Sequence, residues 1–183
     1  MRTTQYRWFW AWDFEKEEKW LNQMAAQGWA LVSVGYCRYE FEACEPGSCA
    51  VRLELLDSLP GSAEGQRYLS FVEETGAQYV GHVMRWAYFR KHAADGAFDL
   101  YSDLDSRIRH LGRIQALLLP LFILNVGNTC TQTANALASG NEWSVVPGAA
   151  AVAAALVSAL LGYGLYRLNQ KRAALVKERQ VRE

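Results

Sequence analysis

The sequence has no surplus of either charge, because 19 lysines and arginines balance 19 aspartates and glutamates. Proteins that bind nucleic acid usually carry a basic surplus, so this composition argues against a nucleic-acid partner. The sequence also has no glycine-rich phosphate loop, nucleophile elbow or paired-carboxylate motif. Its three histidines, His82, His92 and His110, lack the spacing of a metal site or a catalytic triad. These absences predict a protein that is not an enzyme and that binds no metal and no cofactor.

Acidic and basic residues are missing between Arg113 and Glu142. Two largely apolar runs lie in this part of the chain, residues 114–132 and residues 145–168. A bilayer core about 30 Å thick needs about 20 mostly apolar residues in a helix. We therefore expect two transmembrane helices joined by a short extracytosolic loop.

The loop between the two apolar runs, residues 129–144, contains no lysine or arginine. Nine basic residues instead lie at or beyond the outer ends of the runs: Arg107, Arg109, Arg113, Arg167, Lys171, Arg172, Lys177, Arg179 and Arg182. The positive-inside rule then places both termini in the cytosol. Residues 1–6 are polar and lack the apolar core of a secretory signal. The prediction is a multi-pass protein of the plasma membrane, with a basic cytosolic tail over residues 169–183.

Small and polar side chains mark possible packing surfaces on the two membrane helices. Small residues repeat every four positions along the second run in two sets, Ala151, Ala155 and Ala159 in one, and Ala154, Ser158 and Gly162 in the other. Such spacing lets helix backbones approach closely in lipid. Asn125 and Asn128 on the first run are expected to bond to a neighbouring helix rather than face lipid. Two interpretations stay open: the helices pack on each other, or the hairpin docks onto another subunit or a second copy.

Residues 1–98 are predicted to form a cytosolic α+β domain. Period-two aromatic residues predict a strand over residues 6–13, and Asp13 then caps a helix that ends near Gly28. Strands follow at 29–42 and 49–57, then a helix from Ser62 to Gly76 and a last strand at 78–91. The order is that of a ferredoxin-like βαββαβ sandwich with one four-stranded sheet. The two halves also echo each other, since each has a strand, a helix, a glycine and an aromatic-led strand.

Residues 99–113 are predicted to join this domain to the membrane as a helix. Ser102, followed by Asp105 three positions later, has the pattern of a capping box. A helix that starts there would continue into the first apolar run. Asp99, Asp103 and Asp105 cluster at its start, and carboxylates favour the amino-terminal end of a helix. Capping is therefore preferred over a metal site, and over a role as the acidic residues of an enzyme.

Six of the seven tryptophans lie at or before Trp86, and three of them alternate within residues 6–13. These three are either core, a protein or dimer interface, or a small-molecule site such as a cage for a quaternary ammonium. Stacking on single-stranded RNA is disfavoured by the neutral charge. The candidate ligand-binding or partner-binding residues are Trp8, Trp10, Trp12, Arg52 and Trp86. The charged residues 15–19 are read as the solvated face of the first helix.

Cys44 and Cys49 flank a predicted turn and could lie opposite each other across two strands. A redox switch or a metal site is conceivable there. However, the sequence has no C-x-x-C motif and no histidine nearby, and disulfides are rare in the cytosol. Reduced thiols are therefore the preferred interpretation.

Three segments of the first domain carry a family pattern. They are Trp20, Leu21, Met24, Gly28 and Trp29, then Trp86, Tyr88, Phe89, Arg90 and Lys91, and then Phe98, Leu100, Tyr101, Ser102 and Asp103. Over roughly residues 5–110 the chain resembles the bacterial domain of unknown function 2812 family. The resemblance implies a Gram-positive membrane protein with two spans after the domain, encoded beside a PadR-type transcriptional regulator. It implies no established activity and no catalytic residues.

The function expected from these features is a membrane-anchored sensor or interaction module. Its cytosolic domain would bind a partner or an amphipathic small molecule, with a tie to a PadR-type regulator. The alternative is an accessory subunit of a larger membrane complex, such as a transporter. A homo-oligomer is compatible with both hypotheses, and an enzyme is the least favoured hypothesis.

Overall fold

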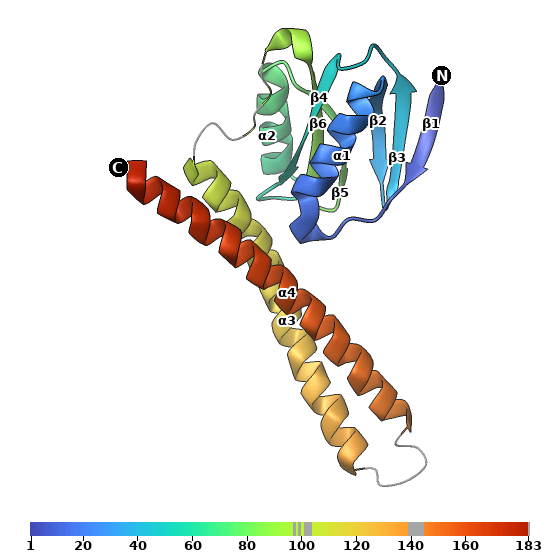
Figure 1. Cartoon of the computed structure of the whole chain (residues 1–183), viewed down its shortest axis with the longest axis vertical. Helices are drawn as coiled ribbons and strands as arrows, with labels where there is room; N and C mark the ends of the chain where they lie inside the picture. Colours follow the sequence, from blue (N-terminus) through green and yellow to red (C-terminus); the bar gives the residue numbers. More distant parts are fainter. Residues whose placement is uncertain (97, 99, 101–103, 139–144, 183) are drawn as a thin grey trace. The chain divides into compact units, whose positions relative to one another are not determined.

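A computed structural model describes residues 1–182 except for 97, 99, 101–103 and 139–144 (Figure 1). The chain divides into two compact units, Met1–Asp103 and Leu104–Glu183. The first unit mixes strands and helices, and the second consists of two long helices. The predicted α+β class is therefore confirmed. Each unit is described below by itself.

The described residues of the first unit form six strands in two three-stranded antiparallel sheets. Sheet A has the order β1-β3-β2 and sheet B the order β4-β6-β5. In chain order the elements are β1 (Arg2–Tyr6), η1 (Ala11–Asp13), α1 (Phe14–Ala26), β2 (Trp29–Gly35), β3 (Arg38–Ala43), β4 (Cys49–Leu55), α2 (Ala63–Glu74), β5 (Gln78–Val83), β6 (Trp86–His92) and η2 (Ala93–Asp95). These strands do not form the single four-stranded sheet predicted for a ferredoxin-like fold.

The predicted strands at 29–42 and 78–91 are each a hairpin. The first turns between Gly35 and Arg38, and the second between Val83 and Trp86, in both cases through two residues. One residue of each turn, Cys37 and Met84 respectively, has a positive φ of 54°. Two-residue hairpins usually carry Asn-Gly or Asp-Gly at this point. Neither turn does, so the sequence gives no local sign that each long predicted strand is two strands joined by a turn.

The strand predicted at residues 6–13 is wrong. The first strand ends at Tyr6, and the backbone N–H of Arg7 donates to the carbonyl of Cys37, in the turn before β3, at 3.0 Å. The chain then leaves the sheet and forms the short η1 helix before α1. The alternating tryptophans therefore reflect contacts between indole rings rather than a pleated strand.

The two sheets belong to two βαββ repeats with the same strand order. Gly28 and Gly76 end α1 and α2, lie 48 positions apart, and both have positive φ angles near 85–88°. The register shift in β2 and the one in β5 are also 48 positions apart, and so are the two two-residue turns. Phe41 and Phe89 are also equivalent, and both are fully buried. The echo noted in the sequence is therefore a structural repeat.

Helix α1 lies between the two sheets, and α2 covers the other side of sheet B (Figure 1). Leu21 of α1 packs in one cluster with Tyr39 and Phe41 of sheet A and with Leu53 and Tyr88 of sheet B. A second cluster joins α2 to the opposite side of β6 through Leu69, Val72, Ala87 and Phe89. The layers are therefore α2, sheet B, α1 and sheet A.

The outer face of sheet A carries charge where sheet B carries core. Glu40 occupies the repeat position of Tyr88, which is buried. Glu40 pairs with Arg38, and Glu42 pairs with Arg90 at 3.4 Å. Terminal units of repeat proteins carry such polar outer faces for solubility.

The second unit is an antiparallel pair of helices, α3 (Leu104–Ala138) and α4 (Val145–Arg182). Three side-chain contacts fix the direction: Asp105 with Arg179 at 2.9 Å, Gln115 with Arg172 at 3.4 Å, and Thr129 with Ser158 at 3.2 Å. One continuous helix contains residues 104–113 of the predicted connector together with the first apolar run. It extends beyond residue 132 to Ala138, and the predicted tail is helical to Arg182. Ser102 of the predicted capping box lies outside the described residues.

Candidate functional site

The three tryptophans at the start of the domain form a ladder of rings, here called the indole ladder. Trp12 in η1 is buried, with 3% of its surface exposed. Trp10 stacks on Trp12 with ring centroids 5.2 Å apart and planes nearly parallel. Trp8 meets Trp10 edge-on, also at 5.2 Å. Trp10 is 39% exposed and Trp8 60% exposed, so the ladder leads from the core to solvent.

Two further exposed aromatic residues belong to backbone segments that meet next to the ladder. The bond from Arg7 to Cys37 brings the turn between β2 and β3 against the chain that follows β1. Tyr6, the last residue of β1, and Tyr36, in the turn, are 75% and 72% exposed. We call Tyr6, Trp8, Trp10 and Tyr36 the aromatic surface. The guanidinium of Arg7 lies 5.2 Å from the ring centres of both Phe9 and Trp20, which fixes the base of this segment.

The structure places the other two predicted residues elsewhere. Trp86 begins β6, and its ring lies 5.6 Å from that of Phe14, partly buried against the core. Arg52 on β4 pairs with Glu18 of α1 at 3.0 Å. Trp8, Trp10 and Trp12 therefore form one cluster, whereas Arg52 belongs to a different feature.

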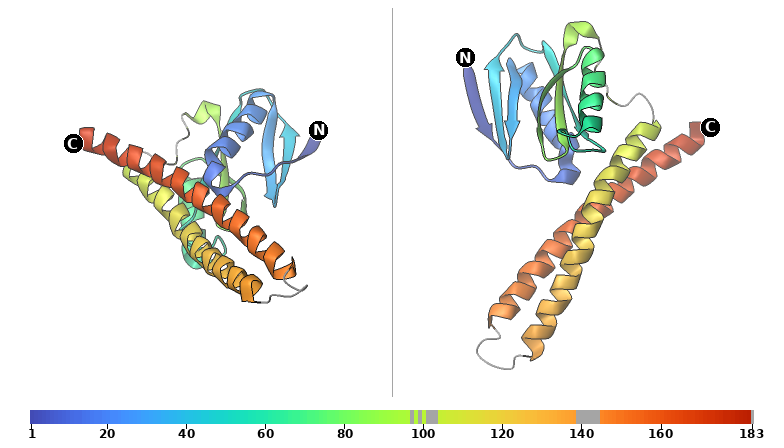
Figure 2. Two further views of the ribbon diagram at one scale, coloured as in Figure 1. Left: turned by 60° about the horizontal axis from the view of Figure 1, so that its bottom comes forward. Right: turned by 180° about the vertical axis from the view of Figure 1, so that it is seen from behind.

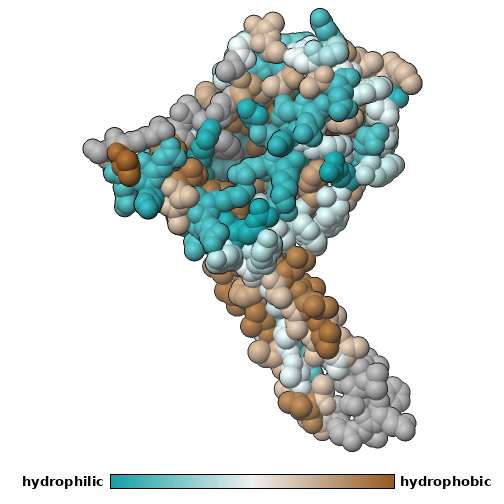
Figure 3. Space-filling view, viewed as in Figure 1, coloured by the Kyte–Doolittle hydropathy of each residue, from teal (hydrophilic) through white to brown (hydrophobic). Residues whose placement is uncertain are grey.

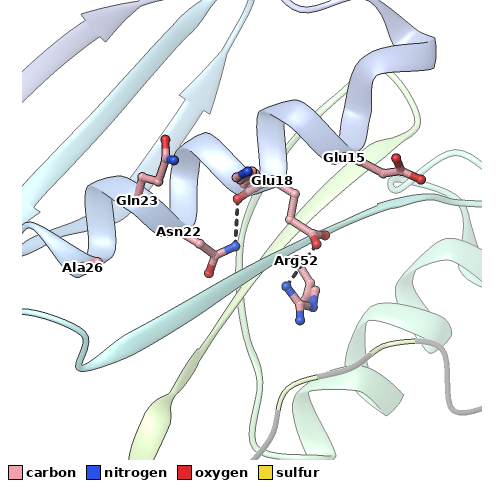
Figure 4. Close-up of a pocket in the computed structure, with 7 residues that line it drawn as sticks. Glu15, Glu18, Asn22, Gln23, Ala26 and Arg52 are labelled. Carbon is pink, nitrogen blue, oxygen red and sulfur yellow. Dashed lines mark hydrogen bonds and ion pairs between the residues drawn. The ribbon is translucent and has the colours of Figure 1, made fainter.

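Arg52 lines an open groove of about 410 Å³ along α1 (Figure 4). The other lining residues are Glu15, Glu18, Lys19, Asn22, Gln23 and Ala26. Figure 4 shows Asn22, Glu18 and Arg52 turned toward the gap between the helix and β4. Asn22 exchanges two bonds with the backbone of Val51, both 2.9 Å, and Glu18 accepts one from the N–H of Leu53 at 3.1 Å. These polar groups thus hold the outer edge of β4, and we assign the groove no ligand.

A buried carboxylate that sequence reasoning missed joins the two sheets. Glu17 of α1 is only 7% exposed, although it was read as part of a solvated face. Its Oε1 accepts hydrogen bonds from the hydroxyls of Tyr39 in sheet A, at 2.7 Å, and Tyr88 in sheet B, at 2.6 Å. Glu17 precedes Leu21 by four positions and so shares its face of the helix. This four-residue spacing is the feature of the sequence that could have predicted the burial of Glu17.

The two tyrosines and Glu17 perturb one another's protonation. Burial raises the pKa of both tyrosine hydroxyls, and the nearby charge of Glu17 raises it further. Burial also raises the pKa of Glu17, and the hydrogen bonds from Tyr88 and Tyr39 offset part of this rise. The raised pKa keeps both tyrosine hydroxyls neutral, as hydrogen-bond donors, at neutral pH.

The raised pKa of Glu17 predicts a specific pH dependence. The folded state holds the proton more tightly, so the associated stability is present below the ordinary value of 4.5 and is lost as pH rises through the raised pKa. Glu17→Gln keeps an acceptor oxygen but cannot ionise. We expect the free energy of unfolding of the wild type to fall relative to this variant over that window, in urea titrations at a series of pH values. A difference that stays constant with pH would contradict the assignment.

The cysteines and aspartates that the structure describes are not grouped into a metal site. Cys44 and Cys49 pack together against Ala25 and Ala30 as free thiols, and burial raises the pKa of Cys49. Among the residues that the structure describes, no three histidine, cysteine, aspartate or glutamate side chains are grouped to hold a metal ion. Asp105 pairs with Arg179, while the predicted Asp99 and Asp103 lie outside the described part.

The predicted packing residues of the helices divide between two faces. Ala154 is buried, Ser158 bonds to Thr129, and a Cβ at Gly162 would lie 3.3 Å from Phe122. This set faces α3. By contrast, Ala155 and Ala159 are exposed and Ala151 is half-buried. On α3, Asn128 is exposed and Asn125 half-buried.

A family model described as protein of unknown function (DUF2812) matches residues 13–123. The chain belongs to this family. No curated protein and no solved structure matches the sequence. The DUF2812 match begins at Asp13 and continues into α3, so it starts later and ends later than the resemblance seen in the sequence.

The DUF2812 match includes Glu17, Tyr39 and Tyr88, but it begins after Trp12. The buried link between the sheets therefore lies inside the family segment. The indole ladder precedes that segment, in a part of the chain that the family model does not describe.

Proposed function

We propose that this DUF2812 protein is a membrane-anchored recognition module. Helices α3 and α4 cross the plasma membrane, and the α+β domain lies in the cytosol. The aromatic surface of that domain binds an amphipathic partner, either a protein or a small molecule. The observation that carries the proposal is the exposed pair Trp8 and Trp10, held on the buried ring of Trp12.

The membrane anchor is supported by the composition of the second unit. Both helices are long and apolar enough to cross a membrane, and apolar side chains predominate on the face of the described hairpin that Figure 3 shows. Basic residues lie at the outer ends of the helices and are missing between them. By the positive-inside rule this distribution puts both termini on the cytosolic side.

The recognition role is supported by the physical character of the aromatic surface. Tryptophan and tyrosine combine large apolar area with a polar group, and they dominate the energetically important contacts of many interfaces. Trp8 and Trp10 are also pre-ordered by ring stacking, so binding would cost little side-chain entropy. The family resemblance implies that the gene lies beside that of a PadR-type regulator, so such a regulator is one protein partner to look for.

The test compares variants in a pull-down from native membranes, with a tag at the amino terminus and mass spectrometry of the eluate. We expect Trp8→Ala/Trp10→Ala to remain folded and to lose a stoichiometric partner that the wild type retains. Phe71→Ala is the matched control, because Phe71 is 60% exposed on α2, away from the aromatic surface. Equal recovery of every partner by all three proteins would refute the proposed role of the aromatic surface.

A second candidate function is an accessory subunit of a larger membrane complex. Ala155 and Ala159 favour it, because they form a small-residue face of α4 that α3 does not cover. Ala155→Leu/Ala159→Leu should then release the protein from a larger complex on native gels. Unchanged migration would argue against this function.

A further inference from the structure

The two sheets have four outer edges, and three of them are covered. The edges of β2 and β5 face each other, since a Cβ at Gly81 would lie 3.2 Å from Val34. Arg90 bonds to the backbone carbonyl of Leu31 at 3.1 Å on the same side of β2. The outer edge of β4 is held by Asn22 and Glu18 of α1.

The outer edge of β1 is the one that differs. Bonds at Met1 and Arg7 show that odd-numbered residues of β1 face β3, so the backbone groups of Arg2, Thr4 and Tyr6 point outward. In the other repeat, Val51 and Leu53 hold the positions of Arg2 and Thr4, because Arg2 pairs with Glu42 and Val51 pairs with its repeat equivalent Arg90. The outward N–H groups of Val51 and Leu53 donate hydrogen bonds to side chains of α1. Within the described part of the chain, no side chain is recorded on the outward groups of β1. Figure 2 shows β1 at the outer end of sheet A.

Apart from the charge of Arg2, the β1 strand lacks the usual devices that protect an edge. It has no proline, lysine or glycine, and its pairing with β3 has no register shift. Natural edge strands are commonly blunted by such residues or by bulges. An unprotected, regular edge accepts another extended strand through its main-chain groups.

We infer that β1 pairs in antiparallel fashion with β1 of a second copy of this chain, around a two-fold axis at Thr4. The outward residues are symmetric about Thr4, so every outward N–H of one strand meets an outward carbonyl of the other. Thr4 lies opposite Thr4, and Arg2 lies opposite Tyr6 of the partner. Threonine pairs and a cation over an aromatic ring are both favourable across strands, and no like charges meet. The result is a continuous six-stranded sheet from two copies of sheet A.

The first test uses proline, which removes a backbone N–H. At Thr4 that N–H points away from β3, so Thr4→Pro blocks the new pairing but leaves the internal ladder intact. Thr4→Val keeps the N–H and suits a strand, and it is the matched control. We expect a dimer by native mass spectrometry of the detergent-solubilised full chain for the wild type and Thr4→Val, and a monomer for Thr4→Pro. A wild type that is monomeric throughout, or a dimer unaffected by Thr4→Pro, overturns the inference.

The second test fixes the register and stands even if Thr4→Pro fails to fold. The native cysteines are first replaced by alanine: Cys37, Cys44, Cys49 and Cys130. Opposed residues of a hydrogen-bonded antiparallel pair lie about 5.5 Å apart at Cα, within the range for a disulfide. Thr4→Cys should therefore cross-link to itself under oxidation in membranes. Arg2→Cys alone should not, whereas Arg2→Cys/Tyr6→Cys should. Failure of Thr4→Cys to form the covalent dimer, or its cross-linking to a different protein, overturns the inference.

Discussion

Glu17→Leu should lower the free energy of unfolding by about 3 kcal/mol, because it leaves the hydroxyls of Tyr39 and Tyr88 buried without an acceptor. Each unsatisfied buried hydroxyl costs about 1–3 kcal/mol. Both tyrosines are 4% exposed, so water cannot readily replace the carboxylate. The measurement is a urea titration of the detergent-solubilised full chain, followed by tryptophan fluorescence.

The matching control removes both donors together with the acceptor. Glu17→Leu/Tyr39→Phe/Tyr88→Phe leaves no polar group unpaired, and replacing all partners by apolar groups can be nearly neutral. We expect it to recover most of the stability lost in Glu17→Leu. If the triple variant is as unstable as the single one, packing rather than hydrogen bonding is what Glu17 contributes.

Trp12→Ala should lower the free energy of unfolding by about 3–5 kcal/mol, as is typical for truncation of a buried tryptophan. Trp12 is the buried foot of the indole ladder, and Trp10 stacks directly on it. Trp8→Ala, at the exposed end, should change stability by less than about 0.5 kcal/mol, as is usual for surface sites. The same urea titration measures both, because Trp20, Trp29 and Trp86 remain as fluorescent reporters.

This pair of variants separates stability from recognition. If Trp8→Ala destabilises the protein as much as Trp12→Ala, the ladder is core throughout and the proposed surface fails. If Trp12→Ala has little effect, the buried position of its ring is contradicted.

The sequence predicts the helices of this protein better than its strands. Ser62 caps α2 by accepting from the N–H of Gly65 at 3.1 Å, and Gly28 and Gly76 end both domain helices, as their residue types indicate. Helix α3 follows from its length and apolar character. These features are local, so the residues themselves carry the signal.

The features that the sequence does not reveal depend on contacts between distant segments. The hairpin turns at Cys37 and Met84 lack the usual turn residues, so only the pairing of the strands defines them. Glu17 looks like a solvated residue until sheet B is placed on the far side of α1. The difference between the edges of β1 and β4 likewise exists only in the folded chain.

The hydrogen bonds of Glu17 to Tyr39 and Tyr88 join the two repeats close to the indole ladder. Glu17 connects both sheets through one helix, and Trp12 lies in η1, the short helix that immediately precedes α1. A change in the position of the indole ladder would therefore act on the helix that holds the two repeats together. If a partner binds the aromatic surface as proposed, the binding would act close to the core of the domain.

The central claim, a membrane hairpin with the domain in the cytosol, is tested most directly by cysteine accessibility in intact cells. In a background without native cysteines, Ala138→Cys at the end of α3 should react with a membrane-impermeant maleimide added outside. Gln27→Cys, at an exposed position of the domain, should react only after the membrane is permeabilised. Labelling of Gln27→Cys in intact cells, or recovery of the protein in the soluble fraction, would contradict the account.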